Sequence, residues 1–310
     1  MNSITKIFIG LSSIFCLVLL GSGVFSRAYS DEFPTAEVGG AHMPMGWNTF
    51  EASWLIGHHV LTPTEGELGQ IESLVIDRTN GRIALVVLSD VPNLGAERLA
   101  IPYSSIKTDI GADTCQFDPG SMEIGPSLEP NYVNNDSYVY ALTRFPSYSQ
   151  FYGLPSTMDV AWLTDIYRHY GQVPYWEAEG QQSPSSLELF DSNRLMGAQI
   201  QLSSGEAAGE IHDFVVDSSD GRIAFVVVSD FPERPTTLIA VPFAELSSRE
   251  NGFALNVTND QLALAVGFDE SELNNMRWAE NDYRHFGLEP YWTERMEMAP
   301  ASSEEEYMEP

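Results

Sequence analysis

The sequence contains a long internal repeat, and this feature restricts the chain to a fold built from two copies of one unit. Three stretches of the first half recur in the second half, each 140 residues further on. They are 69–77, 81–90 and 99–103, which recur at 209–217, 221–230 and 239–243. With 310 residues, the chain is long enough for each copy to bury a core of its own.

A second block recurs at a shorter spacing. The segment from Tyr167 to Trp176 contains Tyr-Arg-His-Tyr-Gly and Pro-Tyr-Trp, and both motifs return between Tyr283 and Trp292, with Phe in place of the second Tyr. Here the copies are 116 residues apart, so the first copy holds 24 more residues between its two blocks. We expect this insertion within about 108–158, a stretch rich in Pro, Asn, Ser and Tyr.

The first block of each copy has the pattern of a β-hairpin. Short runs rich in β-branched residues, 71–76 and 83–88, flank a turn that ends in Asn-Gly at 80–81. The second copy has Asp-Gly at 220–221, and such pairs supply the positive φ angles of tight hairpin turns. The run 83–88 is apolar throughout, which indicates a strand buried on both faces.

The second block of each copy has the pattern of an amphipathic helix followed by a stop. Apolar and aromatic residues recur at helical spacing over about 158–171 and 271–287, with Ser271 as the expected N-cap of the second helix. A glycine ends each pattern, and a proline follows three residues later. The sequence therefore predicts a mostly β fold of two tandem small β-barrels, each followed by an amphipathic α-helix.

The order of these features resembles the PRC-barrel family over about residues 53–107 and 193–248. The shared pattern is a glycine, a strand that ends in Asp, a tight turn with Gly-Arg, an apolar strand and an apolar-Pro-aromatic step. The family takes its name from the photosynthetic reaction centre H subunit and includes the C-terminal domain of a ribosome-maturation factor. The resemblance implies PRC-type barrels that bind protein partners and share no catalytic apparatus. An acidic, exported chain fits neither of those two settings, so the resemblance names no particular partner.

The start of the chain predicts export. Lys6 precedes an apolar run from Ile7 to Phe25, and small residues lead up to Ser30, which is the pattern of a signal peptide cleaved after Ser30. The apolar run spans about 19 residues, so an uncleaved membrane anchor is the alternative. We expect a periplasmic or extracellular location.

The remaining chain is expected to divide at its Gly-, Pro- and Ser-rich stretches. The predicted organisation is a signal peptide (1–30), a flexible N-terminal segment (31–52), a first unit (53–178), a linker (179–192), a second unit (193–296) and a disordered acidic tail (297–310). We expect the two units to pack against each other as a pseudo-twofold pair, because the linker is short.

Charge and cysteine content exclude several classes of function. A net charge of −29 repels phosphate backbones and anionic lipid, so nucleic acid and membrane surfaces are not expected partners. The acidic, lysine-poor composition fits either adaptation to high salt or an ordinary acidic exported protein. Removal of Cys16 with the signal peptide leaves Cys115 alone, which excludes an intramolecular disulfide and a cysteine-based zinc or iron–sulfur site.

Twelve repeated residues are predicted to be structural anchors of the repeated units. They are Gly81, Arg82, Pro102, Arg168, His169 and Trp176 in the first unit and Gly221, Arg222, Pro242, Arg284, His285 and Trp292 in the second. The two histidines have an alternative interpretation as ligands or bases. Asp165 lies one helical turn before His169, but Asn281 replaces it in the second copy, so we favour helix anchoring. The two tryptophans have an alternative interpretation as an exposed aromatic patch.

Features without a counterpart in the other copy are the remaining candidates for chemistry. His58 and His59 are adjacent near Trp54, and neighbouring side chains of a strand point to opposite faces, so we do not expect them to chelate one ion. His42, with Met43 and Met45, could bind a soft metal ion, but a chance grouping is favoured. Common catalytic motifs such as Gly-x-Ser-x-Gly, the P-loop and His-Glu-x-x-His are absent from the sequence.

The sequence therefore predicts an exported, non-catalytic scaffold or adaptor that binds an envelope or extracellular protein, with no catalytic residue, metal or cofactor. The alternative is an exported enzyme or a small-ligand or metal-binding protein with a site in the first unit, built from His58, His59, Asp165, His169 and the insertion. A polar pocket in which these residues converge would favour the alternative.

Overall fold

Both repeats fold into the same succession of strands in the structure, which is a computed structural model. It describes residues 47–120, 122, 135–142, 158–178, 186–249 and 252–293. The predicted signal peptide, most of the segment 31–52, much of the insertion, residues 179–185 of the linker and the tail 297–310 lie outside the described residues. Residues 43–310 belong to one compact unit.

The elements of the two repeats correspond one to one. The first repeat contains β1 (Thr49–Glu51), α1 (Ala52–Leu55), β2 (His59–Leu61), β3 (Glu67–Asp77), β4 (Arg82–Ser89), β5 (Leu99–Pro102), a 3₁₀ turn (Tyr103–Ser105), β6 (Ile106–Asp109) and β7 (Thr114–Phe117). The second contains β10 (Leu189–Asp191), α5 (Ser192–Leu195), β11 (Gln199–Leu202), β12 (Ala207–Asp217), β13 (Arg222–Ser229), β14 (Ile239–Pro242), a 3₁₀ turn (Phe243–Glu245), β15 (Leu246–Arg249) and β16 (Gly252–Leu255).

Helices follow the strands of each repeat. They are α2 (Asn135–Leu142), α3 (Val160–His169) and α4 (Tyr175–Ala178) after the first, and α6 (Asn259–Leu264), a 3₁₀ turn (Glu270–Glu272) and α7 (Met276–His285) after the second. Strands β8 (Met158–Asp159) and β9 (Ser186–Leu187) form a separate small sheet. The prediction of a mostly β fold with two repeated units, each followed by an amphipathic helix, is confirmed. In the part of the chain that the structure describes, the helices are too short or too polar to cross a membrane.

Strands of both repeats join one 14-stranded sheet, and the repeats meet where β4 and β13 begin. The backbone N–H of Ile83 donates to the oxygen of Gly221, and the equivalent bond runs from Ile223 to Gly81, each at 2.8 Å. We call this contact between the two hairpin tips the seam. The reciprocity of its bonds reflects a local twofold relation between the repeats.

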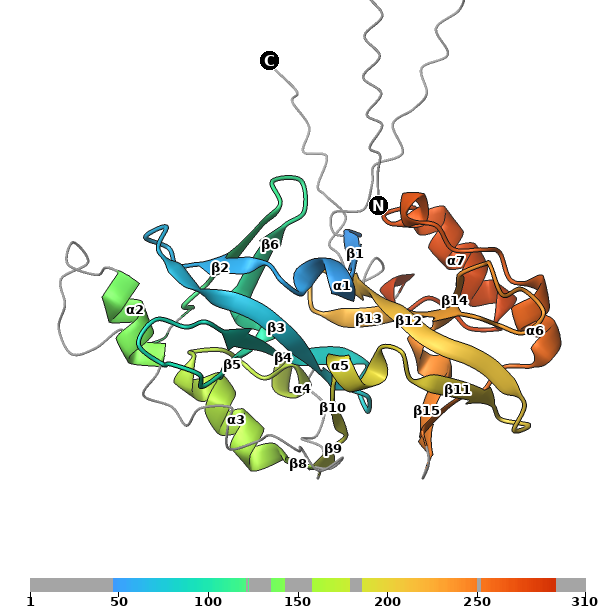
Figure 1. Ribbon diagram of the computed structural model, residues 1–310, viewed down its shortest axis with the longest axis horizontal. Helices are drawn as coiled ribbons and strands as arrows, with labels where there is room; N and C mark the ends of the chain where they lie inside the picture. Colours follow the sequence, from blue (N-terminus) through green and yellow to red (C-terminus); the bar gives the residue numbers. More distant parts are fainter. Residues whose placement is uncertain are drawn as a thin grey trace, which may run out of the picture. The chain divides into compact units, whose positions relative to one another are not determined.

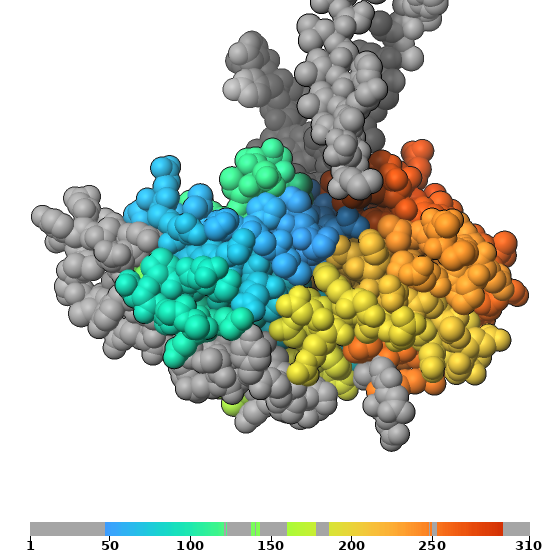
Figure 2. Space-filling view, viewed as in Figure 1, coloured from blue at the N-terminus to red at the C-terminus, as the bar shows by residue number. Residues whose placement is uncertain are grey.

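The first strand and helix of each repeat pack on the other repeat. Strand β1 pairs antiparallel with β12, which places Phe50 opposite Val216. Strand β10 pairs in the same way with β3, which places Phe190 opposite Ile76. Figure 1 shows β1 and α1 beside β12, and Figure 2 shows this blue segment against the yellow and orange surface of the second repeat. We call β1–α1 and β10–α5 the exchanged arms.

The exchanged arms correct two predicted boundaries. The segment 31–52 was expected to be flexible, yet its last residues form β1 and the start of α1, and Phe50 is only 2% exposed. The segment 179–192 was expected to be a linker between the units, yet it contains β9 and β10, and Leu189 is 1% exposed. Residues 49–52 and 186–192 are ordered because they bury apolar side chains on the sheet of the other repeat or beside it.

A glycine near the start of each long strand permits a close approach of backbone. The pairing of β11 with β12 shifts register at Ile200, beside Gly209, whose φ is +105°. A Cβ atom on Gly209 would overlap the carbonyl oxygen of Ser229 on the neighbouring strand. At the equivalent Gly69, a Cβ would lie 2.7 Å from the carbonyl oxygen of Ser89. The glycine that opens the repeated motif is therefore required by sterics.

Tyrosines attach the helices α3 and α7 to the sheet. The hydroxyl of Tyr167 on α3 donates to the carbonyl oxygen of Ala84 at 2.8 Å, and the hydroxyl of Tyr283 on α7 donates to that of Ala224 at 3.0 Å. Both hydroxyls are buried, so each bond satisfies a group that would otherwise be costly to bury. Helix α3 lies within the predicted range 158–171.

The second helix begins later than predicted. Ser271 belongs to a 3₁₀ turn, and α7 starts at Met276 with Asn275 as its N-cap, whose side-chain oxygen accepts from the N–H of Trp278 at 3.1 Å. Asn274 has a φ of +66°, a left-handed conformation that interrupts a right-handed helix. The prediction that Ser271 caps this helix is therefore wrong.

Tyr167 on α3 and Tyr170, which directly follows the helix, give a matched test of this attachment. Tyr170 is fully buried and its hydroxyl has no hydrogen-bond partner, and Phe286 occupies the equivalent position in the second repeat. We expect Tyr170→Phe to leave the free energy of unfolding unchanged or raise it by up to about 1 kcal/mol, and Tyr167→Phe to lower it by about 1–2 kcal/mol. Urea unfolding followed by fluorescence measures both, and equal losses in the two variants would contradict the expectation.

Candidate functional site

The repeated glycines and two aromatic rings meet across the seam. Gly81 and Gly221 occupy the hairpin tips with φ angles of +60° and +71°. A Cβ atom on Gly221 would lie 2.5 Å from the ring of Tyr103, and one on Gly81 would lie 3.0 Å from the ring of Phe243. The aromatic ring of each repeat therefore packs on the hairpin tip of the other, and only glycine leaves room for it.

The two repeated prolines place those rings. Pro102 and Pro242 end β5 and β14 with φ angles of −57° and −50°, close to the value that the proline ring fixes. Each strand pairs with the hairpin of its own repeat, through Leu85 for Pro102 and Phe225 for Pro242. The chain then turns into a short 3₁₀ segment, whose first residue is the ring at the seam.

The two repeated arginines at the seam differ in their surroundings. The buried guanidinium of Arg82 contacts Asp220 of the other repeat, with 3.0 Å from Nη1 to the carboxylate and 3.1 Å to the backbone oxygen. Arg222 lies over the ring of Tyr291 at 4.6 Å, and its Nε lies 4.0 Å from the same Asp220 carboxylate, here within its own hairpin. Asn80 stands where the second repeat has Asp220, and its amide donates within its own hairpin at 2.6 Å. At this position the duplication has therefore diverged in the charge of the side chain.

Removal of the carboxylate at the seam is expected to weaken the contact between repeats. We expect Asp220→Asn to lower the free energy of unfolding by about 1–3 kcal/mol, because the buried Arg82 then lacks its charged partner. The exposed pair between Glu280 and Arg284 gives the control, since Glu280→Gln should change stability by about 0.5 kcal/mol or less. Urea unfolding at neutral pH measures both, and equal effects would contradict a specific role of the seam pair.

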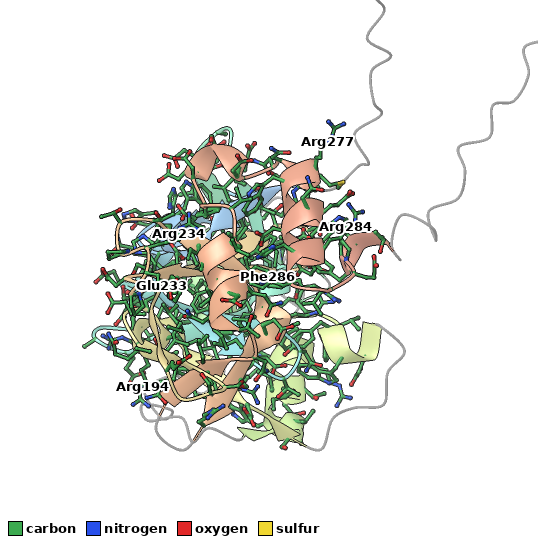
Figure 3. The ribbon with its side chains drawn as sticks, turned by 90° about the vertical axis from the view of Figure 1, so that its right-hand side faces the viewer. Arg194, Glu233, Arg234, Arg277, Arg284 and Phe286 are labelled. Carbon is green, nitrogen blue, oxygen red and sulfur yellow. The ribbon has the colours of Figure 1, made fainter. Side chains whose placement is uncertain are left out.

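The remaining repeated polar residues lie on the helices, away from the seam. Arg168 approaches Asp165 and Glu177 at 4.0 and 3.9 Å, and both side chains of the first pair are largely exposed. Arg284 projects from α7 into solvent (Figure 3) and lies 3.3 Å from Glu280. These contacts do not build a site.

The two repeated histidines have different environments. The Nε2 atom of His285 donates to the backbone oxygen of Gln261 at 2.7 Å, which ties α7 to α6. The ring of His169 packs edge-on against Tyr170 at 5.0 Å. The helix motif therefore attaches to the sheet through its tyrosine, and in the second repeat its histidine also ties α7 to α6.

Both repeated tryptophans are buried. Trp176 is 2% exposed and packs 5.4 Å from Tyr167, and Trp292 is 3% exposed and packs 4.9 Å from Tyr283. Neither indole forms an exposed aromatic patch. Their side chains instead fix the segment that follows each helix against the tyrosine that anchors it.

A hollow of about 500 Å³ lies on the first repeat between the half-buried side chains of Trp54, Ile56 and Leu61, and we call it the Trp54 groove. The side chain of His58 lines one side of the groove. Its Nδ1 lies 2.6 Å from the backbone oxygen of Trp54, and its Nε2 lies 2.9 Å from a carboxylate oxygen of Asp113. Both ring nitrogens thus face acceptors, and the bond to His58 lowers the pKa of Asp113.

Only part of the predicted alternative site meets at this groove, which is lined by His58, His59 and residues 113–115 of the expected insertion range. His59 bonds to Glu67 at 2.6 Å, and neither Asp165 nor His169 lines the hollow. Cys115 is 1% exposed, and burial raises the pKa of its thiol to about 12, so it is a poor nucleophile. Within the described ranges, no group of three or more His, Cys, Asp or Glu side chains is placed to hold a metal ion. The residues 42, 43 and 45 of the other suggested metal group lie outside the described part of the chain.

The second repeat has a more polar surface at the equivalent positions. At the repeat spacing of 140 residues, Arg194 replaces Trp54, Ala198 replaces His58 and Gln201 replaces Leu61. The first two replacements exchange an aromatic ring for a charge and remove the His58 bonds. The apolar residues that line this hollow are therefore not repeated at these positions of the second copy.

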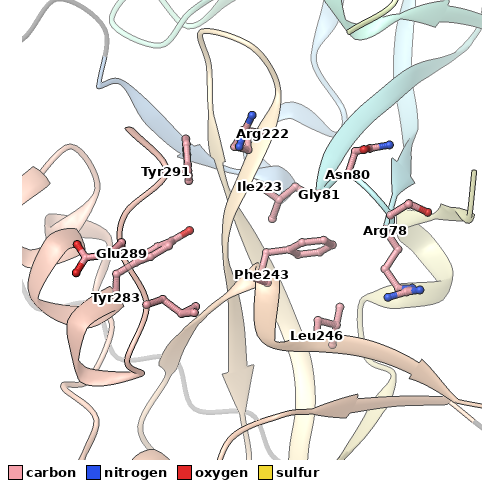
Figure 4. Close-up of a pocket in the computed structure, with 13 residues that line it drawn as sticks. Arg78, Asn80, Gly81, Arg222, Ile223, Phe243, Leu246, Tyr283, Glu289 and Tyr291 are labelled. Atoms are coloured by element: carbon pink, nitrogen blue, oxygen red, sulfur yellow. The ribbon is translucent and has the colours of Figure 1, made fainter. Parts of the chain in front are cut away.

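Two further hollows lie at the seam and are built from equivalent segments. The Arg222 pocket has a volume of about 410 Å³ and lies between the first hairpin tip, 78–81, and the segment 243–246, with Arg222 on its wall (Figure 4). The Lys107 pocket, of about 330 Å³, lies between the second hairpin tip, 218–220, and the segment 103–108. Sequence reasoning found the hairpin tips but missed both pockets, because each needs the other repeat to complete it.

Comparison with known proteins agrees with this architecture. The family model of the PRC-barrel domain matches the chain twice, at residues 48–121 and 187–262. Each match begins five or six residues before the predicted barrel start at 53 or 193, and so takes in an exchanged arm. Among curated proteins, none matches the chain. The chain therefore contains two tandem PRC-barrel domains.

Proposed function

We propose that this protein is an exported, non-catalytic scaffold that binds a protein partner in the cell envelope through the Trp54 groove. The repeated residues are largely occupied in contacts at the seam or within their own domain, which leaves the unrepeated surface for recognition. The observation that carries the proposal is the difference between the copies at positions 54, 58 and 61, where the first domain lines a hollow with Trp, His and Leu and the second has Arg, Ala and Gln.

The groove has the composition of a protein-binding surface. Trp54 and His58 stack with ring centroids 4.4 Å apart, and the bond between His58 and Asp113 holds the β6–β7 turn beside them. A large aromatic side chain whose conformation is already fixed loses little entropy when a partner covers it. Half-exposed Ile56 and Leu61 extend the apolar area on either side.

The test converts the groove into the surface of the second domain. The double variant Trp54→Arg and Leu61→Gln carries the residues of the equivalent positions 194 and 201. We expect a protein that crosslinks to the wild-type chain in its native envelope to be captured at least about tenfold less by the variant. Val173→Gln, which removes an apolar side chain 64% exposed elsewhere, is the control and should capture as the wild type does.

Two outcomes would contradict the proposal. One is capture of the same protein in equal amounts by the groove variant and the wild type. The other is a stoichiometric metal ion in the purified protein with no captured partner, which would favour the alternative of a metal or small-ligand site.

A further inference from the structure

The two seam pockets are formed by equivalent segments of the two repeats, but these segments carry different side chains. At the repeat spacing of 140 residues, Phe243 corresponds to Tyr103 and Leu246 to Ile106, so the aromatic and aliphatic parts are shared. The polar parts differ, because the hairpin tip of one pocket is Arg-Thr-Asn and that of the other is Ser-Ser-Asp. A comparison of the two therefore isolates what has changed since the duplication.

The Lys107 pocket is acidic. Asp118 and Asp220 both line it, and its one cation, Lys107, bonds to Asp118 at 2.8 Å. The carboxylate of a ligand would therefore be repelled in this pocket.

The Arg222 pocket has the opposite character. Its charged lining consists of Arg78, Arg222 and Glu289, and Figure 4 shows the Glu289 carboxylate pointing away from Phe243. Glu188, which bonds to the Nε of Arg78 at 2.6 Å, does not line the pocket. A guanidinium has five donors, so an arginine that bonds one carboxylate can bond a second one.

The floor of the Arg222 pocket is apolar. Ile223, Leu246 and the ring of Phe243 form it, and the rings of Tyr283 and Tyr291 stand beside it (Figure 4). The hydroxyls of both tyrosines already donate, to Ala224 and to Asp217, so the rings offer a ligand their faces and edges. A volume of about 410 Å³ is within the range of small-ligand and peptide side-chain sites.

We propose that the Arg222 pocket binds an acidic peptide segment, in which a carboxylate side chain meets the arginines and a neighbouring aromatic or aliphatic side chain lies on the apolar floor. Charge-assisted, two-point bonds between guanidinium and carboxylate supply the specificity. The site is additional to the Trp54 groove and does not depend on it. In a chain of net charge −29, most of the surface repels such a segment, so the pocket also fixes where it binds.

The test uses two acetylated and amidated tetrapeptides that differ in one group, Gly-Glu-Phe-Gly and Gly-Gln-Phe-Gly. Two-dimensional NMR titration of the full chain should give a dissociation constant of about 1 mM or lower for the Glu peptide, and about tenfold weaker binding for the Gln peptide. Signals of the pocket residues should shift. Equal affinity for the two peptides, or no binding of the Glu peptide at several times that concentration, would overturn the proposal.

Variants locate the site. Asn80→Asp puts a carboxylate on the pocket wall, and we expect it to weaken binding of the Glu peptide about tenfold while leaving that of the Gln peptide unchanged. Ser104→Asp adds the same charge to the Lys107 pocket and should leave both affinities unchanged. Arg78→Gln keeps the hairpin turn and serves as a second variant if Asn80→Asp fails to fold. Equal losses from Asn80→Asp and Ser104→Asp would refute the assignment.

The result of the peptide titration does not depend on whether the Trp54 groove binds a protein partner. The Trp54→Arg, Leu61→Gln variant should bind the Glu peptide as the wild type does. Loss of peptide binding in that variant would place the peptide on the groove and overturn the present proposal, whatever partner the groove binds.

Discussion

Gly209→Ala is expected to lower the free energy of unfolding by about 3 kcal/mol or more, and so to unfold much of the second domain at moderate temperature. The Cβ atom would overlap the carbonyl oxygen of Ser229, which belongs to a central strand and cannot move without breaking pairing with β12. The φ of +105° adds a conformational penalty for any residue other than glycine. Thermal and urea unfolding of the purified variant measure the loss.

Gly205 provides the control for that variant. It also has a positive φ, +93°, but no atom lies within 4 Å of a Cβ placed on it. Gly205→Ala should therefore cost only the conformational penalty of about 1–2 kcal/mol. Equal losses in the two variants would show that the close approach to Ser229 carries no extra cost.

Asp282→Asn is expected to raise the free energy of unfolding by about 3 kcal/mol at pH 8 and to change it little at pH 4. Asp282 lies on the inner face of α7, is 3% exposed, and neither of its carboxylate oxygens has a hydrogen-bond partner. Burial raises its pKa to about 8. The first domain has Ile166 at the equivalent position, which indicates an apolar site.

The pH dependence follows from this raised pKa. An aspartate in the unfolded chain has a pKa of about 3.9, so the folded state holds the proton more tightly. The contribution of the protonated Asp282 is complete below about pH 4, decreases as the pH rises, and is lost as the pH passes about 8. Asparagine does not ionise, so the variant keeps its stability over this range.

Urea unfolding at several pH values between 4 and 9 measures the difference between Asp282→Asn and the wild type. Glu280→Gln on the exposed face of the same helix is the control and should show no comparable increase. A difference that stays constant from pH 4 to pH 9 would mean that Asp282 does not hold its proton in the folded protein.

Much of the repeated unit could be predicted from the sequence, because its signals are local. The Asn-Gly and Asp-Gly turns, the apolar run 83–88 and the helix that ends before Gly171 each specify their own conformation within a few residues. The later start of α7 was missed because the left-handed conformation of Asn274 depends on a contact with Thr49, which is 225 residues away.

The exchanged arms could not be predicted, for a physical reason. Strands β1 and β10 have three residues each, too few for an alternating pattern, and their partner strands lie in the other domain. A three-residue strand whose partner lies in the other domain leaves no recognisable pattern in the nearby sequence.

The candidate sites were only partly foreseen. The glycines and arginines at 81, 82, 221 and 222 do meet at the seam, but the partners Tyr103, Phe243 and Asp220 were not singled out. At the spacing of 116 residues, Asp282 aligns with Ile166. This alignment of an acid with an apolar residue could have identified Asp282 as a buried acid. The sequence does not indicate which residues of one repeat contact which residues of the other across the seam.

The exchanged arms also constrain the order in which this chain can fold as it emerges from a ribosome. Strand β1 appears early, yet it cannot pair until residues 215–217 of β12 have followed it. The first domain must therefore wait with an unpaired strand position until more than half of the chain has appeared. Closure of such a long loop slows folding.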